Sequence, residues 1–217
     1  AFVFGLLFLG PVALADAQIE KTFERSTMNG RTVQAPYVTY EEFQSATVRS
    51  PNGQATFHEI LTVPSLKKVT RLLGEATSIE RTDAADLESH TVHLHYKGGV
   101  QIMYTGFPDG TFGLTSLDLQ SSEWSLTVGG TTFRPNANVS QLNSALRTSL
   151  DLPSGAKAGK ENDTRTEGIY IADPDASKDE AVTPLKNGMT QVGIKARVGS
   201  GTIESVYLRD RKSTRLN

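Results

Sequence analysis

Residues 91–105 read TVHLHYKGGVQIMYT, two runs of alternating apolar and polar residues on either side of a Gly-Gly pair. Alternation with a period of two predicts β-strands that bury one face. A three-residue loop at Lys97–Gly99 pairs Tyr96 with Val100 and brings all the apolar residues of both strands to one face. A two-residue loop at Gly98–Gly99 would divide them between the two faces. The sequence therefore predicts an antiparallel hairpin with the three-residue loop.

A helix before this hairpin and a strand after it extend the pattern. Residues 65–73 have apolar side chains at helical spacing, with Pro64 suited to the first turn and Gly74 to the position just beyond the last turn. A strand over 112–119 follows a Pro-Asp-Gly turn. Pro51-Asn52-Gly53 is another turn signal, and it predicts a further hairpin within residues 43–63.

The same order of elements recurs further along the chain. Residues 139–149 repeat the helix, with Asn138 as the N-cap. The strand positions have these counterparts: Ile169 and Ile171 for Val92 and Leu94; Val192, Ile194 and Ala196 for Val100, Ile102 and Tyr104; Ile203, Val206 and Leu208 for Leu114, Leu117 and Leu119. The last strand of each set breaks its alternation at the same place. We interpret this as an internal duplication.

The predicted fold class follows from these elements. We expect an α+β domain over residues 37–209, built from two tandem helix-plus-three-strand units at about 60–124 and 125–209. The units should form one antiparallel sheet with the helices on one face. The apolar strand positions should be buried together with Leu66, Val69, Leu73, Leu142 and Ala145. Residues 18–36 are polar and are interpreted as a linker.

The two ends of the chain are set aside from the fold. Residues 2–15 form an apolar run that ends in Ala13-Leu14-Ala15, typical of a secretory signal peptide with cleavage near Ala15 or Ala17. We therefore expect residues 1–17 to be a signal peptide truncated at its start, and the mature protein to be periplasmic or secreted. Residues 210–217, DRKSTRLN, match a translated sequencing adapter and are interpreted as a non-native tail; the alternative is a real basic tail.

The stretch ILTVPSLKKVTRLLGEAT (residues 60–77), followed by two strands, a turn and GLTSLDL, resembles the repeat of the β-lactamase-inhibitor-protein-like fold. It is also similar to small outer-membrane assembly lipoproteins. Leu73-Gly74 matches the motif of these families after the helix, whereas Val63-Pro64-Ser65 lacks their Gly and Ala76 replaces their Pro. The chain has no Cys to carry a lipid. The resemblance spans roughly residues 60–209 and implies an envelope binding protein rather than an enzyme.

Residues that could support chemistry are few. His93 and His95 share one strand face, opposite Gln101 and Met103, and are candidate metal ligands; the simpler interpretation is a solvated strand face. Gly155–Glu161 is one residue short of a phosphate-binding loop and follows a helix, so we interpret it as a connector. No Cys and no Gly-x-Ser-x-Gly motif occurs, which excludes two common nucleophile schemes. We predict no catalytic residue and no cofactor.

The two units differ most at one hairpin tip. The second unit has about eighteen residues, Pro174 to Gln191, where the first turns in three. Hairpin loops normally have two to five residues, and longer ones tend to be functional or disordered. The acidic residues at its start are the candidates for binding a partner protein: Asp173, Asp175, Asp179 and Glu180. The alternatives are a solvated mobile loop and, with its Asp-x-Asp start but no loop Gly or terminal Glu, a calcium site.

Composition limits the function classes that remain. The 22 basic and 24 acidic residues of the 217-residue chain are nearly balanced, which argues against nucleic-acid binding. One hypothesis is a non-enzymatic exported protein that binds another macromolecule, as an inhibitor or assembly factor in the envelope. The other is a small-molecule-binding or hydrolytic periplasmic protein with a site assembled from scattered residues. A concave pocket would favour the second, and a flat sheet face with a protruding loop the first.

Overall fold

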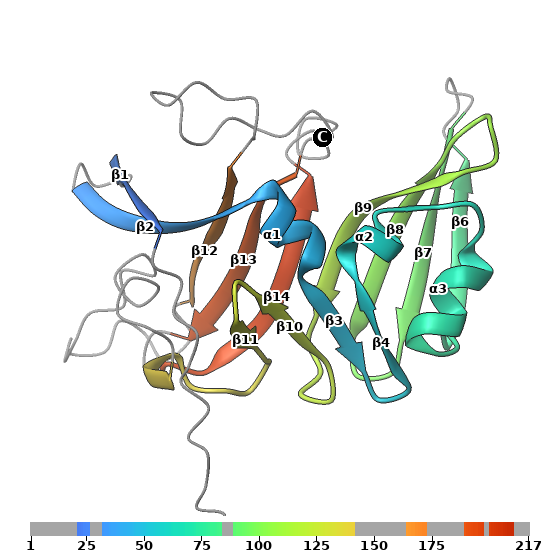
Figure 1. Ribbon diagram of the computed structural model, residues 1–217. Coiled ribbons are helices and arrows are strands. Elements are labelled where there is room, and N and C mark those ends of the chain that lie inside the picture. The colour runs from blue at the N-terminus through green and yellow to red at the C-terminus, as the bar shows by residue number, and fades with distance from the viewer. Residues whose placement is uncertain are drawn as a thin grey trace, which may run out of the picture.

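The computed structural model describes residues 21–26, 32–83, 89–141, 164–172, 189–197 and 200–210. These residues form a large β-sheet, and a smaller sheet and three short helices lie over one side of it (Figure 1). Among them, no helix has the length and apolar character needed to cross a membrane.

The large sheet has ten strands in the order β1-β2-β12-β13-β14-β9-β8-β7-β6, and the short β5 pairs with β9. Neighbouring strands run antiparallel except β2 and β12, which are parallel where Tyr37–Thr39 meets Tyr170–Ala172. The bounds are β1 Thr22–Ser26, β2 Thr32–Thr39, β5 Thr62–Val63, β6 Ser78–Asp83, β7 His90–Tyr96, β8 Val100–Gly106, β9 Phe112–Leu119, β12 Thr164–Ala172, β13 Met189–Arg197 and β14 Ile203–Asp210. The sheet is thus mainly antiparallel, as expected.

The second sheet has four short strands in the order β11-β10-β3-β4. Its strands are β3 Thr47–Ser50, β4 Gly53–Thr56, β10 Ser125–Val128 and β11 Thr131–Phe133. The helices are α1 Tyr40–Ser45, α2 Phe57–Ile60, α3 Leu66–Leu73 and the 3₁₀ turn η1 Val139–Gln141. Helices α1 and α2 flank the β3–β4 hairpin, so residues 40–60 form one compact covering layer.

The core lies between the two layers. Inward-facing side chains of the large sheet, such as Leu94 and Ile102, belong to the same buried cluster as Val48 and Leu126 of the small sheet. The rings of Phe43 in α1 and Phe57 in α2 stack 4.6 Å apart. Burial of apolar surface in this one cluster is the main stabilising term, because the chain has no Cys that could form a disulfide.

The β7–β8 hairpin has the predicted register. Tyr96 pairs with Val100, Leu94 with Ile102 and Val92 with Tyr104, and all six side chains are buried. Gly98 and Gly99 have φ angles of +82° and +81°, a conformation that other residues rarely adopt. The loop is therefore the three-residue one.

The second strand pair of each three-stranded meander, β7–β8–β9 and β12–β13–β14, contains a β-bulge, and β13–β14 has a further irregularity between Met189 and Gln191. Met103 pairs with Ser116 and Tyr104 with Leu114, so Thr115 is the extra residue. Lys195 pairs with Ser205 and Ala196 with Ile203, so Glu204 is the extra residue. A bulge inserts one residue without changing the buried face. This explains the irregular spacing of the apolar residues in β9 and β14.

Helix α3 begins after Ser65 and ends at Leu73, as predicted, and the β3–β4 hairpin docks on its C-terminal end. The hydroxyl of Ser50 lies 2.8 Å from the Leu73 carbonyl oxygen and accepts bonds from the N–H groups of Asn52 and Gly53, at 3.1 and 3.0 Å. A side chain at Gly53 would collide with the carbonyl of Leu72. The turn expected at Pro51–Gly53 is confirmed, with Ser50 paired to Gly53.

Residues 18–36, predicted to be a linker, contain strands in the part that the structure describes. Strands β1 and most of β2 lie in this range and pair with each other, Thr22 opposite Pro36 and Ser26 opposite Thr32. Only the end of β2, beyond this range, joins the rest of the sheet. The β1–β2 hairpin pairs with the rest of the large sheet only through Tyr37–Thr39, so it needs few apolar residues. Its polar sequence therefore resembles that of a linker.

The strands of both predicted meanders lie in one sheet, as expected, whereas β3, β4, β10 and β11 form a second sheet that was not expected. Of the predicted helix 139–149, only η1 is described, and Asn138 Oδ1 accepts a bond from the Ser140 N–H at 2.9 Å. Residues 142–149 lie outside the described residues, with Leu142 and Ala145 among them.

Strand β12 is shifted by four residues from the predicted alignment. Ile169 pairs with Val192, the counterpart of Val100, and so takes the place of Tyr96 rather than Val92. A shift by an even number of residues leaves the alternation of a strand in phase. Alternation therefore could not distinguish the two alignments.

Candidate functional site

The outer face of the large sheet, which points away from the small sheet, carries the histidines singled out by sequence. His93 and His95 alternate with the buried Val92, Leu94 and Tyr96 along β7. His93 pairs with Met103 and His95 with Gln101, as the predicted register requires. The imidazoles are therefore half-buried on the polar face, where solvent reaches them.

Four side chains from three strands come together there, and we call them the histidine cluster: Glu80, His93, His95 and Gln101. The Gln101 amide nitrogen lies 2.9 Å from His93 Nδ1. The two imidazole rings are nearly parallel, with an interplanar angle of 11° and centroids 6.1 Å apart. His95 Nε2 is 3.6 Å from a carboxylate oxygen of Glu80, which projects from β6.

This arrangement suits hydrogen bonding better than metal binding. When the Gln101 amide donates to His93 Nδ1, that lone pair is occupied and Nε2 carries the proton, so neither nitrogen can bind a cation. Within the described segments, no three His, Asp or Glu side chains are grouped closely enough to hold a metal ion. The cluster can exchange protons and donate or accept hydrogen bonds across a surface.

Other polar side chains of the outer face pair with one another. The hydroxyls of Thr105 and Thr115 lie 2.9 Å apart between β8 and β9. At the second bulge, Glu204 contacts Arg197 at 2.9 Å and Lys195 at 3.2 Å. Bonds from Arg197 and then from Lys195 hold the pKa of Glu204 below its usual value. The face therefore presents fixed charges of both signs.

Asp118 and Tyr207 lie opposite each other where the two meanders meet, in the β9–β14 pair. The Tyr207 ring covers Gly193, where a side chain would collide with it. One carboxylate oxygen of Asp118 accepts a bond from Gln120 at 3.3 Å, and the other is buried and has no hydrogen-bond partner among the described residues. A buried oxygen without a donor is a normal place for an ordered water.

The tyrosines with perturbed pKa values lie in the core. Burial raises the pKa of Tyr104, whose hydroxyl donates to the Ile60 carbonyl oxygen at 3.0 Å. Burial, with a smaller contribution from Glu75, raises the pKa of Tyr96 to about 12. The Tyr96 ring packs edge-on against Trp124, 4.9 Å away. Both tyrosines connect packed elements and act as structural groups.

Two glutamates cap helices in the same way. Thr39 and Glu42 form a capping box at α1, and Thr56 and Glu59 form one at α2. Bonds from the Thr56 N–H and then its hydroxyl hold the pKa of Glu59 below its usual value. At Glu42, partial burial raises the pKa, but bonds from Lys21 and Thr39 outweigh this effect and the pKa is lowered. These carboxylates serve the fold.

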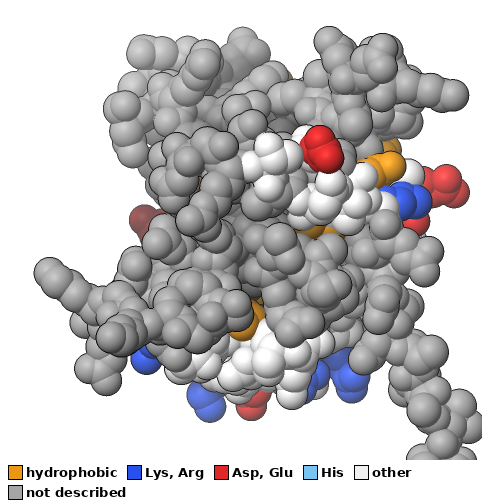
Figure 2. All heavy atoms as spheres, turned by 90° about the vertical axis from the view of Figure 1, so that its left-hand side faces the viewer, with side chains coloured by type: hydrophobic (Ala, Val, Ile, Leu, Met, Phe, Trp, Pro, Cys, Tyr) orange, Lys and Arg blue, Asp and Glu red, His pale blue; other side chains and the backbone are white. Residues whose placement is uncertain are grey.

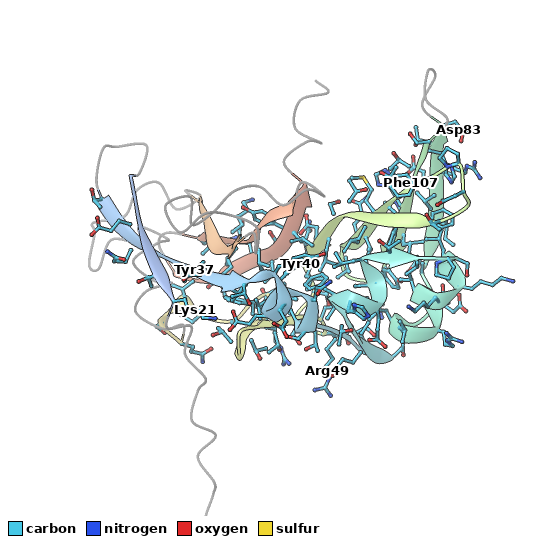
Figure 3. All side chains as sticks on the ribbon, turned by 45° about the horizontal axis from the view of Figure 1, so that its top comes forward. Lys21, Tyr37, Tyr40, Arg49, Asp83 and Phe107 are labelled. Carbon is cyan, nitrogen blue, oxygen red and sulfur yellow. The ribbon has the colours of Figure 1, made fainter. Side chains whose placement is uncertain are left out.

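Strand β6 forms one end of the large sheet and was not predicted from the sequence. All six of its residues are exposed. Ile79 is 60% exposed, although it pairs with Leu94, which is fully buried. Figure 3 places Asp83, the last residue of β6, near the end of the molecule where Phe107 lies. Ser78-Ile-Glu-Arg-Thr gives only a weak strand signal, because a single apolar residue shows no alternation.

On the side of the molecule seen in Figure 2, the described residues show separate acidic and basic side chains and small hydrophobic areas. Charges of both signs are present, as on an ordinary soluble surface. The acidic residues proposed as partner-binding candidates, Asp173, Asp175, Asp179 and Glu180, lie outside the described residues. Met189–Gln191, expected in the same loop, instead belong to β13.

Comparison of the chain with protein-family models, with characterised proteins and with solved structures gave no significant match.

Proposed function

We propose that this chain is an exported, non-enzymatic envelope protein that binds another macromolecule, as an inhibitor or an assembly factor. The observation that carries the proposal is the outer face of the large sheet. Its side chains on β7 and β8 are half-buried and, apart from Met103, polar, while the residues between His93 and Thr105 that alternate with them are buried, such as Leu94 and Ile102. A broad face of this kind fits a macromolecular surface better than a small molecule.

Placement in the envelope is supported by the sequence. The apolar run at residues 2–15 and its Ala-x-Ala ending are typical of a signal peptide. A periplasmic or secreted protein meets its partners there, and the resemblance to β-lactamase-inhibitor-protein-like and assembly-lipoprotein repeats favours the same interpretation.

The proposal includes an internal duplication, and the strand register supports it. In the alignment of the two units, Leu117 is equivalent to Val206, and Leu119 is equivalent to Leu208. In the sheet, Leu117 pairs with Leu208 and Leu119 pairs with Val206, so the pairing exchanges the two equivalent positions. Asp118 pairs with its own equivalent, Tyr207, which is the pattern of a local two-fold axis. The two bulges occur at equivalent positions, Thr115 and Glu204. We propose that the two units arose from one helix-plus-three-strand ancestor.

The perturbed groups do not favour the enzymatic alternative. Glu42, Glu59 and Glu204 have lowered pKa values because they cap helices or pair with cations. A general acid or base near neutral pH would need the opposite shift for a carboxyl group. We therefore keep macromolecular binding as the proposed function.

The test is capture from an envelope extract by the tagged protein. The outer-face variant is Thr91→Lys with Thr105→Glu, a cross-strand pair whose opposite charges suit the sheet while the added bulk blocks the face. The matched control is Lys67→Gln with Arg71→Gln, on the side of α3 that faces solvent. We expect the outer-face variant to retain less than about a tenth of the captured partner, and the control to retain all of it. Equal capture by both variants would refute the role of this face.

A further inference from the structure

We propose that the free edge of strand β6 is a docking site for an extended segment of the partner protein, which adds one strand to the large sheet. The inference rests on the proposed function, since it names a second contact for the same kind of partner. Addition of a strand to an exposed sheet edge is a common mode of peptide recognition.

The edge is accessible along its whole length. In the described part of the chain, β6 pairs with β7 on one side, from Ser78 opposite His95 to Asp83 opposite His90. It stands at the end of the strand order. Figure 1 shows it at the right-hand end of the large sheet, with α3 in front. A strand with one unpaired edge presents backbone N–H and C=O groups to a partner.

The core is incompletely covered at this end. Ile79 lies on the inward-facing side, in the same row as Leu94 and Ile102, yet more than half of its surface is exposed. Leu66 and Leu72 of α3 are only partly buried against the core. Among the described residues, Ile79 and Phe107 are the two large apolar side chains that are exposed. One more strand beside β6 would place a side chain against Ile79 and extend the core.

A second copy of the chain does not fit this edge. In a two-fold dimer, two copies of β6 would pair antiparallel, with the inward face of each strand on the same side of the sheet. This is possible only if the two-fold axis passes beside one residue, which then pairs with its own copy. Centring on Glu80 or Arg81 places identical charges directly opposite each other. If the axis passes beside Thr82, Ile79 lies opposite residue 85, which is beyond the end of β6. If the axis passes beside Ile79, only residues 78–80 of the two β6 strands pair with each other. No register both buries Ile79 and uses the strand.

The charges on β6 define the chemistry of the segment. Arg81 and Asp83 pair with each other at 3.1 Å and need no partner. Glu80, whose side chain is 68% exposed, has only the 3.6 Å contact with His95. The segment should therefore place a basic side chain beside Glu80 and an apolar one beside Ile79. An extended peptide that alternates apolar and basic residues meets both conditions.

The test uses a capped, fluorescently labelled peptide of alternating valine and lysine, seven residues long, with the full chain. Control peptides replace each lysine with glutamate, or carry N-methyl groups on the odd or on the even residues. Binding is followed by fluorescence anisotropy, and amide hydrogen exchange locates it. We expect the lysine peptide to bind, one N-methylated form to fail, and exchange to slow in residues 78–83.

Variants of the protein distinguish peptide binding at the β6 edge from nonspecific binding to exposed apolar residues. Ile79→Thr should weaken peptide binding about fivefold, and Glu80→Gln should do so to a similar extent and remove its salt dependence. Phe107→Thr, which removes the other exposed apolar side chain, is the matched control and should bind normally. Any one of three results would overturn the inference. Ile79→Thr and Phe107→Thr could weaken binding equally, both N-methylated peptides could bind as well as the unmodified one, or the lysine peptide could fail to bind.

The proposed function and this inference can fail separately. If an envelope partner is captured equally well by the wild type and by Ile79→Thr, but lost by the outer-face variant, the function stands and the edge is not its contact. If the edge binds the peptide but no envelope partner is captured, the edge inference stands and the proposed function fails.

Discussion

The contact between the β3–β4 hairpin and α3 gives a sharp test of how the covering layer is assembled. Ser50 is 4% exposed, and its hydroxyl contacts four backbone groups: the carbonyl oxygens of Leu73 and Gly53 and the N–H groups of Asn52 and Gly53. Ser50→Ala removes this hydroxyl from a buried position. Buried backbone groups without partners cost about 1–3 kcal/mol. We expect a loss of about 2 kcal/mol, or roughly 4–8 °C in Tm for a domain of this size.

Ser45→Ala is the matched control for this prediction. The Ser45 hydroxyl donates to the Glu42 carbonyl oxygen at 2.8 Å, but the bond is exposed, so water replaces it. This variant should change stability by less than about 0.5 kcal/mol. Urea and thermal unfolding, followed by circular dichroism, measure both. If the two variants differ by less than about 0.5 kcal/mol, the hairpin does not depend on Ser50 and the reasoning is wrong.

Three further predictions concern pH, the core and the long loop. Glu59→Gln should be less stable than the wild type at pH 7. The pKa of Glu59 is lowered in the folded protein, so its carboxylate stabilises the fold only while it is ionised, and the difference in stability should shrink as the pH falls below the ordinary glutamate pKa of about 4.3. Unfolding curves between pH 3 and 7 measure this difference. Leu73→Ala, in the core, should cost about 2–5 kcal/mol by urea unfolding, and the half-buried Leu66→Ala less. Replacing residues 173–188 with Lys-Gly-Gly should preserve the fold and, if the acidic loop contacts the partner, reduce capture of the envelope partner.

The β7–β8 hairpin could be predicted in detail because one physical condition decides it. All the apolar residues must share a face, and only a loop at Lys97–Gly99 allows this. The outward positions of His93 and His95 followed from the same register. What the two histidines contact did not follow, because Glu80 comes from a strand with no clear pattern.

The second sheet could not be predicted because its pairing is short and distant in sequence. Thr47 of β3 pairs with Thr127 of β10, and each strand has four residues. So few residues give no periodicity to detect. The helices beside it did leave a signal, since Thr39-x-x-Glu42 and Thr56-x-x-Glu59 are capping boxes. Each helix is only one or two turns long, and no apolar stripe drew attention to it.

The predicted counterparts in β12 show the limit of matching by alternation. An alignment shifted by four residues preserves the face of every side chain, so Ile169 could be matched with either Val92 or Tyr96. The bulges are more specific markers, because an extra residue at one point of a strand does not arise from alternation. Thr115 and Glu204 therefore carry more weight for the duplication than the apolar matches do.

On the proposed duplication, function should lie where the two units differ, since the shared features are needed for the fold. One difference is the hairpin tip, three residues at Lys97–Gly99 against residues 173–188 between β12 and β13. The other difference is the strand that pairs with the outer side of the first strand of each meander, β7 or β12. In the second unit, β2 from a distant part of the chain lies beside β12. In the first unit, β6 lies there, with its outer edge unpaired in the described structure. By this correspondence β6 takes the place of β2, and a segment added to the β6 edge would take the place of β1, which pairs with β2 at the other end of the sheet.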